Sequence, residues 1–373
     1  MLAGEVLAPG RVNLIGEHID YHGLPVLPIA IGRRIRIRFR ARAGRRIRVS
    51  STAPFGRREF AWTGELPPVA AGDWENYLRA AANAVARHWG AGMGIDARID
   101  SDLPPAAGLS SSSALLVAFT LCLLAAKGVE AGFEELMAIL PGAEHFVGTR
   151  GGGMDHAAIL ASRGGCASLI AFTPLHVRHI PVPDDWAFLV AHSLETAEKS
   201  GDARAAYNAR RQAGTTALAR LGMASYRAAI ASDLPQPALL ARLESAEEQD
   251  AFLHTTAEAE RVRQAVAAMQ SGDAAAFGRL LAESQRSLRD RLRVSSPALD
   301  SLVEAAMACG ALGARLTGAG FGGAVVALAR KADLPALRRG LIARYYAARP
   351  DFRETYHLID AIPASGAAVL SCA

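Results

Sequence analysis

Four consecutive serines stand between a glycine and the longest apolar run of the chain. Ser110–Ser113 follow Gly108 closely, and the 13 residues from Ala114 to Ala126 are apolar except for Thr120. Because a membrane span needs roughly 20 residues, this run predicts a buried helix instead. Backbone N–H groups and the helix dipole at its start favour a bound anion. A helix cap needs one serine, so four of them predict a phosphate-binding loop.

The scarcity of lysine limits which phosphate-binding motif this loop can be. The sequence contains three lysines, none of which follows a glycine: Lys127, Lys199 and Lys331. This excludes the GxxxxGK[ST] loop, and no lysine lies in a VAIK-like strand, so the two commonest nucleotide-phosphate motifs are both absent. A phosphate site in this chain must therefore use backbone amides and arginine.

Arginine alternates with apolar residues near the N-terminus. Nine arginines lie between Arg33 and Arg48. The alternation predicts a two-stranded ribbon with arginine on one face. Because no set of aromatic residues for stacking on bases accompanies them, a solvated sheet face is favoured over a nucleic-acid surface. We therefore expect no nucleic-acid partner, despite the net charge of +5.

Length and composition predict a two-domain α+β protein. A chain of 373 residues with 51% hydrophobic and 21% charged residues has an ordinary globular composition. Strand and helix patterns mix in both halves, with a boundary expected between residues 175 and 185. The four cysteines form no CxxC pair and the N-terminus lacks a signal pattern, so we expect a cytoplasmic protein without a membrane partner. We also expect a monomer.

A second polar cluster occupies residues 9–23, with the sequence PGRVNLIGEHIDYHG. Arg11, Glu17, His18 and Asp20 stand there among glycines and strand-like apolar residues, a mixture that a structural strand does not need. Carboxylates combined with hydrogen-bond donors are what a polyhydroxylated ligand requires. The run therefore predicts a site for such a ligand.

Taken together, the motifs resemble those of the galactokinase branch of the GHMP small-molecule kinases. The opening run looks like the branch signature GRVNLIGEHTDYN, and the serine loop looks like the family's phosphate loop. The combination runs nearly end to end and is far more specific than any one glycine loop. The further segments that carry the resemblance are WENY at 74–77, GGGMD at 151–155 (similar to GIMDQ), SLRDRLRVS at 287–295 and LTGAGFGG at 316–323.

The resemblance implies an ATP-dependent sugar kinase that makes a sugar 1-phosphate, with galactose as the default acceptor and with ATP and Mg²⁺ as cofactors. It implies a two-domain GHMP kinase fold with the active site between the domains. The N-terminal α+β domain, residues 1–178, would carry the phosphate loop. The C-terminal ferredoxin-like domain, residues 179–373, would carry the glycine-rich third motif.

Position by position, the resemblance also implies the site residues. Asp155 would orient or deprotonate the anomeric hydroxyl of the sugar, and Arg11 would neutralise charge on the transferring phosphoryl group. An Asp beside an always-protonated Arg stays ionised at neutral pH, which suits both roles. The sugar contacts would be Glu17, His18, Asp20, Gly152 and Tyr207. The ATP contacts would be Gly108, Ser110, Ser111, Ser112, Ser113, Gly318, Gly320 and Gly322, and the metal ligands Ser112 and Glu144.

Glu144 departs from the family pattern. The usual metal-binding Glu stands three residues before an FVG-like tripeptide, whereas Glu144 stands two before Phe146. One residue is a rotation of about 100° on a helix, so either the helix is locally rearranged or Glu144 is not a ligand. We therefore expect Ser112 to matter more to the metal than Glu144 does.

Two alternatives stay open within this interpretation. Ile19 gives the tripeptide HID, which galacturonate kinases carry where galactokinases have HTD, and cations for a uronate are available at Lys199, Arg204 and Arg210. The other alternative is a catalytically silent sugar-sensing regulator on the same fold. The retained Arg11, Asp155 and Ser112 argue against a silent protein.

Overall fold

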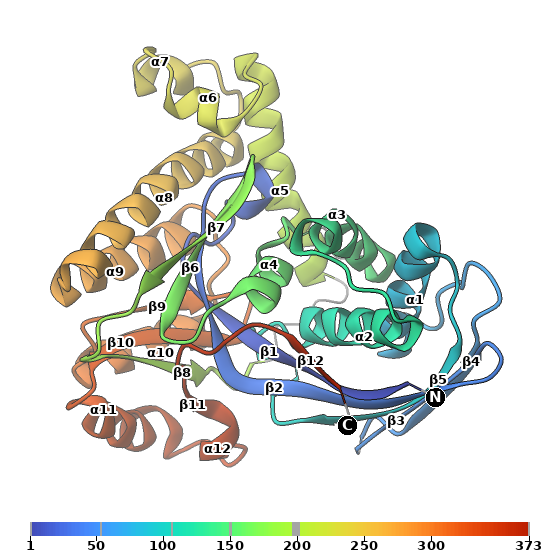
Figure 1. Cartoon of the computed structure of the whole chain (residues 1–373). Coiled ribbons are helices and arrows are strands. Elements are labelled where there is room, and N and C mark those ends of the chain that lie inside the picture. The colour runs from blue at the N-terminus through green and yellow to red at the C-terminus, as the bar shows by residue number, and fades with distance from the viewer. Residues whose placement is uncertain (1, 53, 106, 149–150, 196–201, 372–373) are drawn as a thin grey trace.

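Two main β-sheets, each with helices packed on it, organise the described chain (Figure 1). The computed structural model describes residues 2–52, 54–105, 107–148, 151–195 and 202–371. Of these residues, six strands form the larger sheet, in the order β12-β1-β2-β5-β3-β4. Their bounds are β1 (Ala3–Ile15), β2 (Leu27–Arg42), β3 (Arg46–Ser51), β4 (Arg57–Ala61), β5 (Gly94–Ser101) and β12 (Ala368–Ser371).

One face of this sheet is covered by helices and the other carries the arginines. The outer half of β2 alternates buried and more exposed residues, which is the pattern of a half-buried strand. On the covered face, α2 (Ser111–Lys127) and α4 (Met154–Ala161) pack against β1 and β2. The helices α1 (Glu75–Trp89) and α3 (Phe133–Glu144) pack against α2 and against each other. The apolar run predicted to be a buried helix is α2. No helix of the described residues is long and apolar enough to cross a bilayer.

The expected arginine ribbon is wrong in its strand pairing. β2 and β3 are not neighbours, because β5 lies between them, antiparallel to β2 and parallel to β3. Alternation decides which face a residue occupies, but it does not decide which strand lies beside it. The arginine face itself is present and carries ion pairs, with Arg38 3.1 Å from Glu5 and Arg48 3.2 Å from Glu59.

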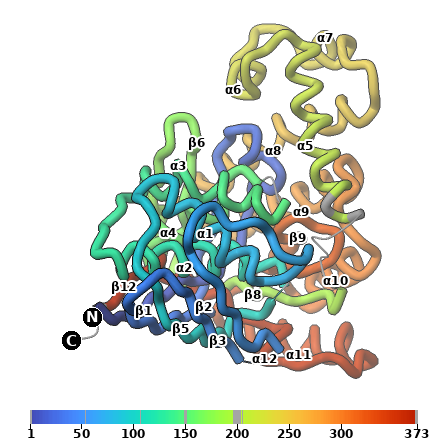
Figure 2. Tube along the Cα trace, turned by 90° about the vertical axis from the view of Figure 1, so that its right-hand side faces the viewer, coloured from blue at the N-terminus to red at the C-terminus, as the bar shows by residue number. Residues whose placement is uncertain are grey.

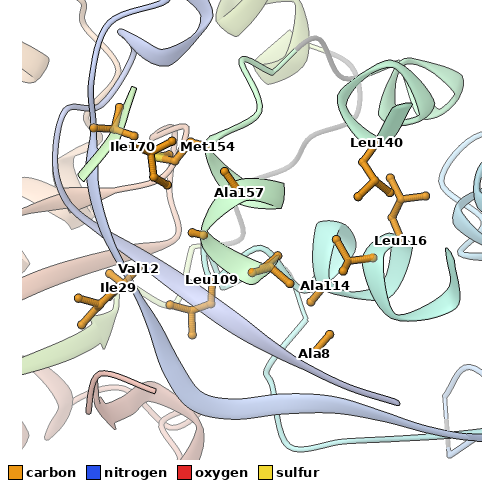
Figure 3. Packing of buried hydrophobic residues seen from close by; sticks show 14 of the residues in the cluster. Ala8, Val12, Ile29, Leu109, Ala114, Leu116, Leu140, Met154, Ala157 and Ile170 are labelled. Carbon is orange, nitrogen blue, oxygen red and sulfur yellow. The ribbon is translucent and has the colours of Figure 1, made fainter. Parts of the chain in front are cut away.

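Buried side chains fix the start of α2 against the sheet and α4 (Figure 3). Ala114 of α2 is fully buried, as are Ala8 of β1 and Ala157 of α4, and Leu109 just before the helix is nearly so. Small residues at these contacts let the backbones approach closely. The packing therefore places the serine loop next to the first turn of α4, which contains Asp155.

A second sheet has the ferredoxin-like arrangement. Within the described chain it consists of β8 (Trp186–His192), β9 (Gly313–Thr317), β10 (Ala324–Arg330) and β11 (Leu358–Asp360), in the order β11-β8-β10-β9. In chain order this is 4-1-3-2 with all neighbours antiparallel, which is the split βαβ topology. Its helices are α9 (Ala274–Asp290), α10 (Pro297–Ala308), α11 (Leu334–Leu341) and the short α12 (Glu354–His357).

The long helical segment between β8 and β9 links the second sheet to the first. It contains α5 (Asp202–Leu221) and α8 (Ala246–Ser271), which pack against each other. The shorter α6 (Tyr226–Ile230) and α7 (Gln236–Leu240) lie at their outer end (Figures 1 and 2). Prolines stand at the starts of two of the helices here: Pro237 lies in the first turn of α7 and Pro297 is the first residue of α10, where a missing N–H costs nothing.

The division at residue 178 stays a prediction. That residue lies within β7 (Leu175–Pro181), which forms a hairpin with β6 (Cys166–Phe172). In addition, β12 comes from the C-terminal segment but pairs antiparallel with β1 of the first sheet. The C-terminal segment therefore contributes to both sheets.

Candidate active site

Arg11 of β1 and Asp155 of α4 meet beside the start of α2. Arg11 Nε and Nη2 lie 2.7 and 2.6 Å from Asp155 Oδ1, and Nη1 donates to the Gly108 carbonyl at 3.0 Å. Burial alone would lower the pKa of Arg11, but Asp155 and Glu17 outweigh it and hold that pKa above its ordinary value. Arg11 is therefore charged at any physiological pH.

The four serines of the loop divide into two pairs. Ser110 has a left-handed backbone (φ +57°), and its hydroxyl donates to Asp155 Oδ2 at 2.5 Å. Ser113 is fully buried, lies 3.3 Å from the same carboxylate oxygen, and donates to Glu144 Oε1 at 2.8 Å. The other two hydroxyls belong to partly exposed residues, Ser111 and Ser112. The loop therefore presents one pair of serines to the carboxylates and leaves the other pair nearer to solvent.

The glycine-rich third motif packs directly on this loop. Gly108 (φ +74°) and Gly318 (φ +88°) approach so closely that a Cβ on Gly318 would lie 3.3 Å from the Gly108 carbonyl oxygen. A Cβ on Gly320 would lie 2.2 Å from the Val294 carbonyl oxygen, and Gly322 has φ +116°. Close backbone packing and left-handed conformations therefore account for these glycines, and their contact with ATP stays a prediction.

Glu17 lies inside a buried polar network. Its Oε1 accepts from the Gly318 N–H at 2.6 Å and lies 3.1 Å from the guanidinium of Arg315, which is fully buried. The Thr317 hydroxyl donates to the same oxygen at 3.2 Å, and Asn13 Nδ2 donates to Oε2 at 2.9 Å. One carboxylate oxygen is thus committed to the protein, and the other retains acceptor capacity for one more donor.

Both ring nitrogens of His18 bind protein groups. Nδ1 lies 3.0 Å from the Tyr21 hydroxyl and Nε2 lies 3.1 Å from the Ala319 carbonyl oxygen. Burial lowers the pKa of His18, so the neutral ring donates from Nε2 and accepts at Nδ1. His18 therefore ties the opening run to the third motif, and its contact with a sugar stays a prediction.

Asp20 of the opening run and Gly152 of the loop before α4 contact each other. Asp20 begins the 3₁₀ turn η1 (Asp20–His22), and its Oδ2 accepts from the Gly152 N–H at 3.1 Å. Burial raises the pKa of Asp20 to about 6, and the nearby Asp155 adds to the shift. A Cβ on Gly152 would lie 2.3 Å from the Tyr21 nitrogen, so only glycine lets the two segments approach. The predicted sugar residue Gly152 is thus in place, with its amide directed at Asp20.

Tyr207 of α5 joins this group from the other side. Its ring centroid lies 5.3 Å from that of His18 and 5.8 Å from that of Tyr21. Burial and the nearby Asp20 raise its pKa well above the ordinary value, so the hydroxyl stays protonated. The structure therefore brings together the residues that the opening run and the later motifs predicted.

Family comparisons match the segments that build this site. The galactokinase galactose-binding signature matches residues 4–41, the GHMP kinases N terminal domain matches residues 76–163, and the GHMP kinases C terminal matches residues 265–348. A galactokinase of Roseiflexus sp. (strain RS-1) is 37% identical over 359 residues, which cover 91% of this chain and 87% of that protein. A galactokinase of Streptomyces coelicolor is 34% identical, covering 96% and 92%.

The chain belongs to the galactokinase family of GHMP kinases. It is an ATP-dependent phosphotransferase. The crystal structure of Lactococcus lactis galactokinase complexed with galactose has a TM-score of 0.88 at 26% identity, covering 98% of this chain and 95% of that one. Methanococcus jannaschii mevalonate kinase has a TM-score of 0.66 at 17% identity, covering 99% and 98%, which shows the shared fold. The predicted α+β GHMP kinase fold is confirmed.

In this kinase, the Glu144 carboxylate reaches the phosphate loop from the last residue of α3, and its role as a metal ligand stays a prediction. The α-helix α3 ends at Glu144 and continues as a 3₁₀ turn, η2 (His145–Val147). A 3₁₀ turn rotates about 120° per residue instead of about 100°, which changes the direction of the following segment. The carboxylate faces Ser113 and not Ser112. Among the described residues, no group of three or more His, Cys, Asp or Glu side chains is placed to hold a metal ion.

The sequence did not reveal how α8 supports the kinase site. Glu258 is fully buried and accepts from the Gly16 N–H at 2.9 Å, while His254 Nε2 lies 3.0 Å from the Glu17 carbonyl oxygen. Burial would raise the pKa of Glu258, but Arg261 outweighs it, with help from His254, and holds that pKa at about 2. Polar residues four apart also mark an ordinary solvated helix face, so the pattern alone could not identify these supports. For Arg315, the sequence gives a weak indication of a role in the site, because it is a single charged residue within a short apolar strand.

Proposed function

We propose that this kinase transfers the γ-phosphoryl group of ATP to the anomeric hydroxyl of galactose and releases galactose 1-phosphate and ADP. The observation that carries the proposal is the Arg11–Asp155 pair at the start of α2, within reach of the phosphate loop. The galactose-binding signature over residues 4–41 and the galactokinase relatives supply the identity of the sugar.

Asp155 acts on the acceptor in this proposal. Donors from Arg11 and Ser110 hold both of its oxygens, and its side chain is 19% exposed, so an edge stays accessible to substrate. It orients the anomeric hydroxyl or accepts its proton as the oxygen attacks the γ-phosphorus. The fixed charge of Arg11 stabilises the transferring phosphoryl group, because phosphoryl transfer depends mainly on positioning and positive charge.

ATP would lie with its phosphates at the N-terminus of α2. The amides there point outward, and the hydroxyls of Ser111 and Ser112 are partly exposed. Glu144 and Ser112 would hold Mg²⁺, since a carboxylate and a hydroxyl form the oxygen donor set that this cation prefers. When bound, Mg²⁺ would neutralise charge on the phosphate oxygens.

The sugar would lie between η1 and α5. Asp20 is the main acceptor for its hydroxyls, because both oxygens of Glu17 already accept from protein donors. Tyr207 closes the site opposite, with a protonated hydroxyl that can donate or accept. The remaining predicted contacts, His18 and Gly152, would act mainly by fixing the shape of this pocket.

Galacturonate stays the alternative acceptor. A uronate carboxylate placed near Asp20 without a cation would cost several kcal/mol, on the order of an unpaired buried charge. Arg210 uses its Nε to donate to the Leu292 carbonyl oxygen at 2.5 Å, so part of its guanidinium is already engaged. Lys199 and the side chain of Arg204, the other two candidate cations, lie outside the described residues.

An ADP-release assay with a panel of sugars tests the proposal. We expect galactose to be phosphorylated with a kcat/KM at least about tenfold above that for galacturonate, equivalent to about 1.4 kcal/mol of discrimination. The opposite ranking would overturn the choice of sugar. Absence of turnover with every sugar would instead favour the silent sugar-sensing regulator.

A further inference from the structure

His156 is a buried imidazole that forms no hydrogen bond within the described part of the chain. It follows Asp155 in the first turn of α4, at the position where the family's GIMDQ pattern has Gln. The side chain is about 2% exposed, and neither ring nitrogen has a hydrogen-bond partner among the described residues. Buried polar groups are nearly always hydrogen-bonded, so two orphaned nitrogens on one ring indicate an absent partner.

The neighbour of this imidazole is Glu144. Its Oε2 lies 3.9 Å from His156 Nε2, while its Oε1 accepts from Ser113. A nitrogen–oxygen hydrogen bond needs about 2.7–3.2 Å, so the two groups form no hydrogen bond, although they lie within the distance of about 4 Å that defines an ion pair. Two ligands each about 2.1 Å from a shared metal ion lie about 3.0 Å apart when adjacent in an octahedron, about 3.4 Å apart in a tetrahedron and about 4.2 Å apart when opposite. The observed 3.9 Å lies between the tetrahedral and the opposite separations, so the two groups can share an ion after a shift of a few tenths of an ångström.

Gly151 brings no side chain of its own to the carboxylate oxygen that faces His156. A Cβ on Gly151 would stand 3.8 Å from Glu144 Oε2, which is ordinary van der Waals contact. Glu144 and His156 therefore offer one oxygen and one nitrogen donor close to each other beside the phosphate loop.

We propose that His156 is a nitrogen ligand of the cation bound at Glu144 and that it makes this site prefer borderline transition-metal ions such as Co²⁺ over Mg²⁺. Imidazole suits first-row transition metals, whereas Mg²⁺ takes oxygen ligands and keeps several waters. The preference is a property of the chain's own ligand set. The inference rests on the cation site of the proposed function.

Direct cation binding tests this assignment on the full chain stripped of metal with a chelator. Calorimetric titrations with Co²⁺ and with Mg²⁺ give the two dissociation constants without any turnover. Proton NMR of the Co²⁺-loaded protein detects a ligating imidazole through the strongly shifted resonance of its ring N–H. The variants are His156→Gln, Glu144→Gln and, as a matched control, His145→Gln, an exposed histidine adjacent to Glu144.

We expect the unsubstituted chain to bind Co²⁺ at least about tenfold more tightly than Mg²⁺. His156→Gln should lose most of that difference together with the shifted imidazole resonance, and its Mg²⁺ affinity should change by less than about threefold. His145→Gln should behave like the unsubstituted chain, and Glu144→Gln should weaken both cations. Thermal midpoints measured with chelator present establish that each variant is folded.

Equal affinities for the two cations, or an imidazole resonance that persists in His156→Gln, would overturn the inference. Phosphorylation of galactose with Mg²⁺ alongside equal affinities would leave the proposed function standing and remove only the nitrogen ligand. The expected cation-binding pattern without turnover on any sugar would support the nitrogen ligand and overturn the proposed function.

Discussion

Replacing Glu17 by Gln tests whether this residue serves the fold or the sugar. The change removes the carboxylate that lies 3.1 Å from Arg315, which is fully buried. Removing one partner of a buried ion pair typically costs about 3–5 kcal/mol, because the remaining charge is left without compensation. The side-chain amide of Asn13 can rotate so that its unpartnered Oδ1 accepts from the new amide, which keeps that hydrogen bond. The substitution therefore isolates the loss of charge.

The size of the effect can be measured as a shift in unfolding. At about 2–4 °C per kcal/mol for a domain of this size, Glu17→Gln should lower the thermal midpoint by about 6–20 °C. Urea unfolding without sugar gives the corresponding free energy. As a control, Glu5→Gln removes a carboxylate paired with the exposed Arg38 and should cost less than about 1 kcal/mol.

A double-mutant cycle with Arg315→Met completes the test. Arg315→Met alone leaves the Glu17 carboxylate buried without its cation, whereas the double variant has no uncompensated charge, so it should be more stable than the sum of the two single changes implies. The reasoning is refuted if Glu17→Gln unfolds within about 0.5 kcal/mol of the unsubstituted chain and instead raises the KM for galactose. That result would show that Glu17 contacts the sugar and does not stabilise the fold.

Three further predictions concern the chemistry. Asp155→Asn should lower kcat by about 10²-fold or more while ATP binding survives, as checked by steady-state kinetics and nucleotide titration; near-normal turnover would remove Asp155 from the mechanism. Because the pKa of Asp20 is raised to about 6 in the folded state, its ionisation costs stability as pH rises from its ordinary pKa to about 6. Asp20→Asn should therefore be more stable than the unsubstituted chain at pH 7.5 and lose this advantage at pH 4, as urea midpoints at the two pH values would show. The KM for galactose should rise below about pH 6 in the unsubstituted chain but not in Asp20→Asn, as KM profiles against pH would show. Finally, because the Glu144 carboxylate reaches the phosphate loop, Glu144→Gln should raise the Mg²⁺ concentration for half-maximal rate more than Ser112→Ala does. A larger effect at Ser112 would restore the register argument.

Strands and helices follow from local patterns that the sequence displays, whereas the ferredoxin-like order was implied only by the family resemblance. Alternation predicts β2, the apolar run predicts α2, and the prolines mark the starts of α7 and α10. The partner of a strand depends instead on contacts between distant segments. For this reason the sequence did not show that β5, which comes much later in the chain, lies between β2 and β3.

Site residues were predictable as members of the site but not in their contacts. The left-handed conformation of Ser110 decides which hydroxyls of the first turn meet the carboxylates, and no residue type signals it, because Ser rarely adopts positive φ. The contact of Glu144 with Ser113 depends on how α3 packs against α2, which no local pattern determines. Support from α8 through Glu258 joins positions 242 residues apart in sequence, beyond the reach of any local pattern.

The pairing of β12 with β1 ties completion of the first sheet to the order of synthesis. On the ribosome, β1 to β5 emerge early, but the strand that covers the free edge of β1 emerges only after the entire second sheet. Until then Val6 and its neighbours present unpaired backbone groups along that edge, and such edges recruit strands from other molecules. A chain released before residues 368–371 would keep this unpaired strand edge, so truncated products should aggregate more readily than full-length ones.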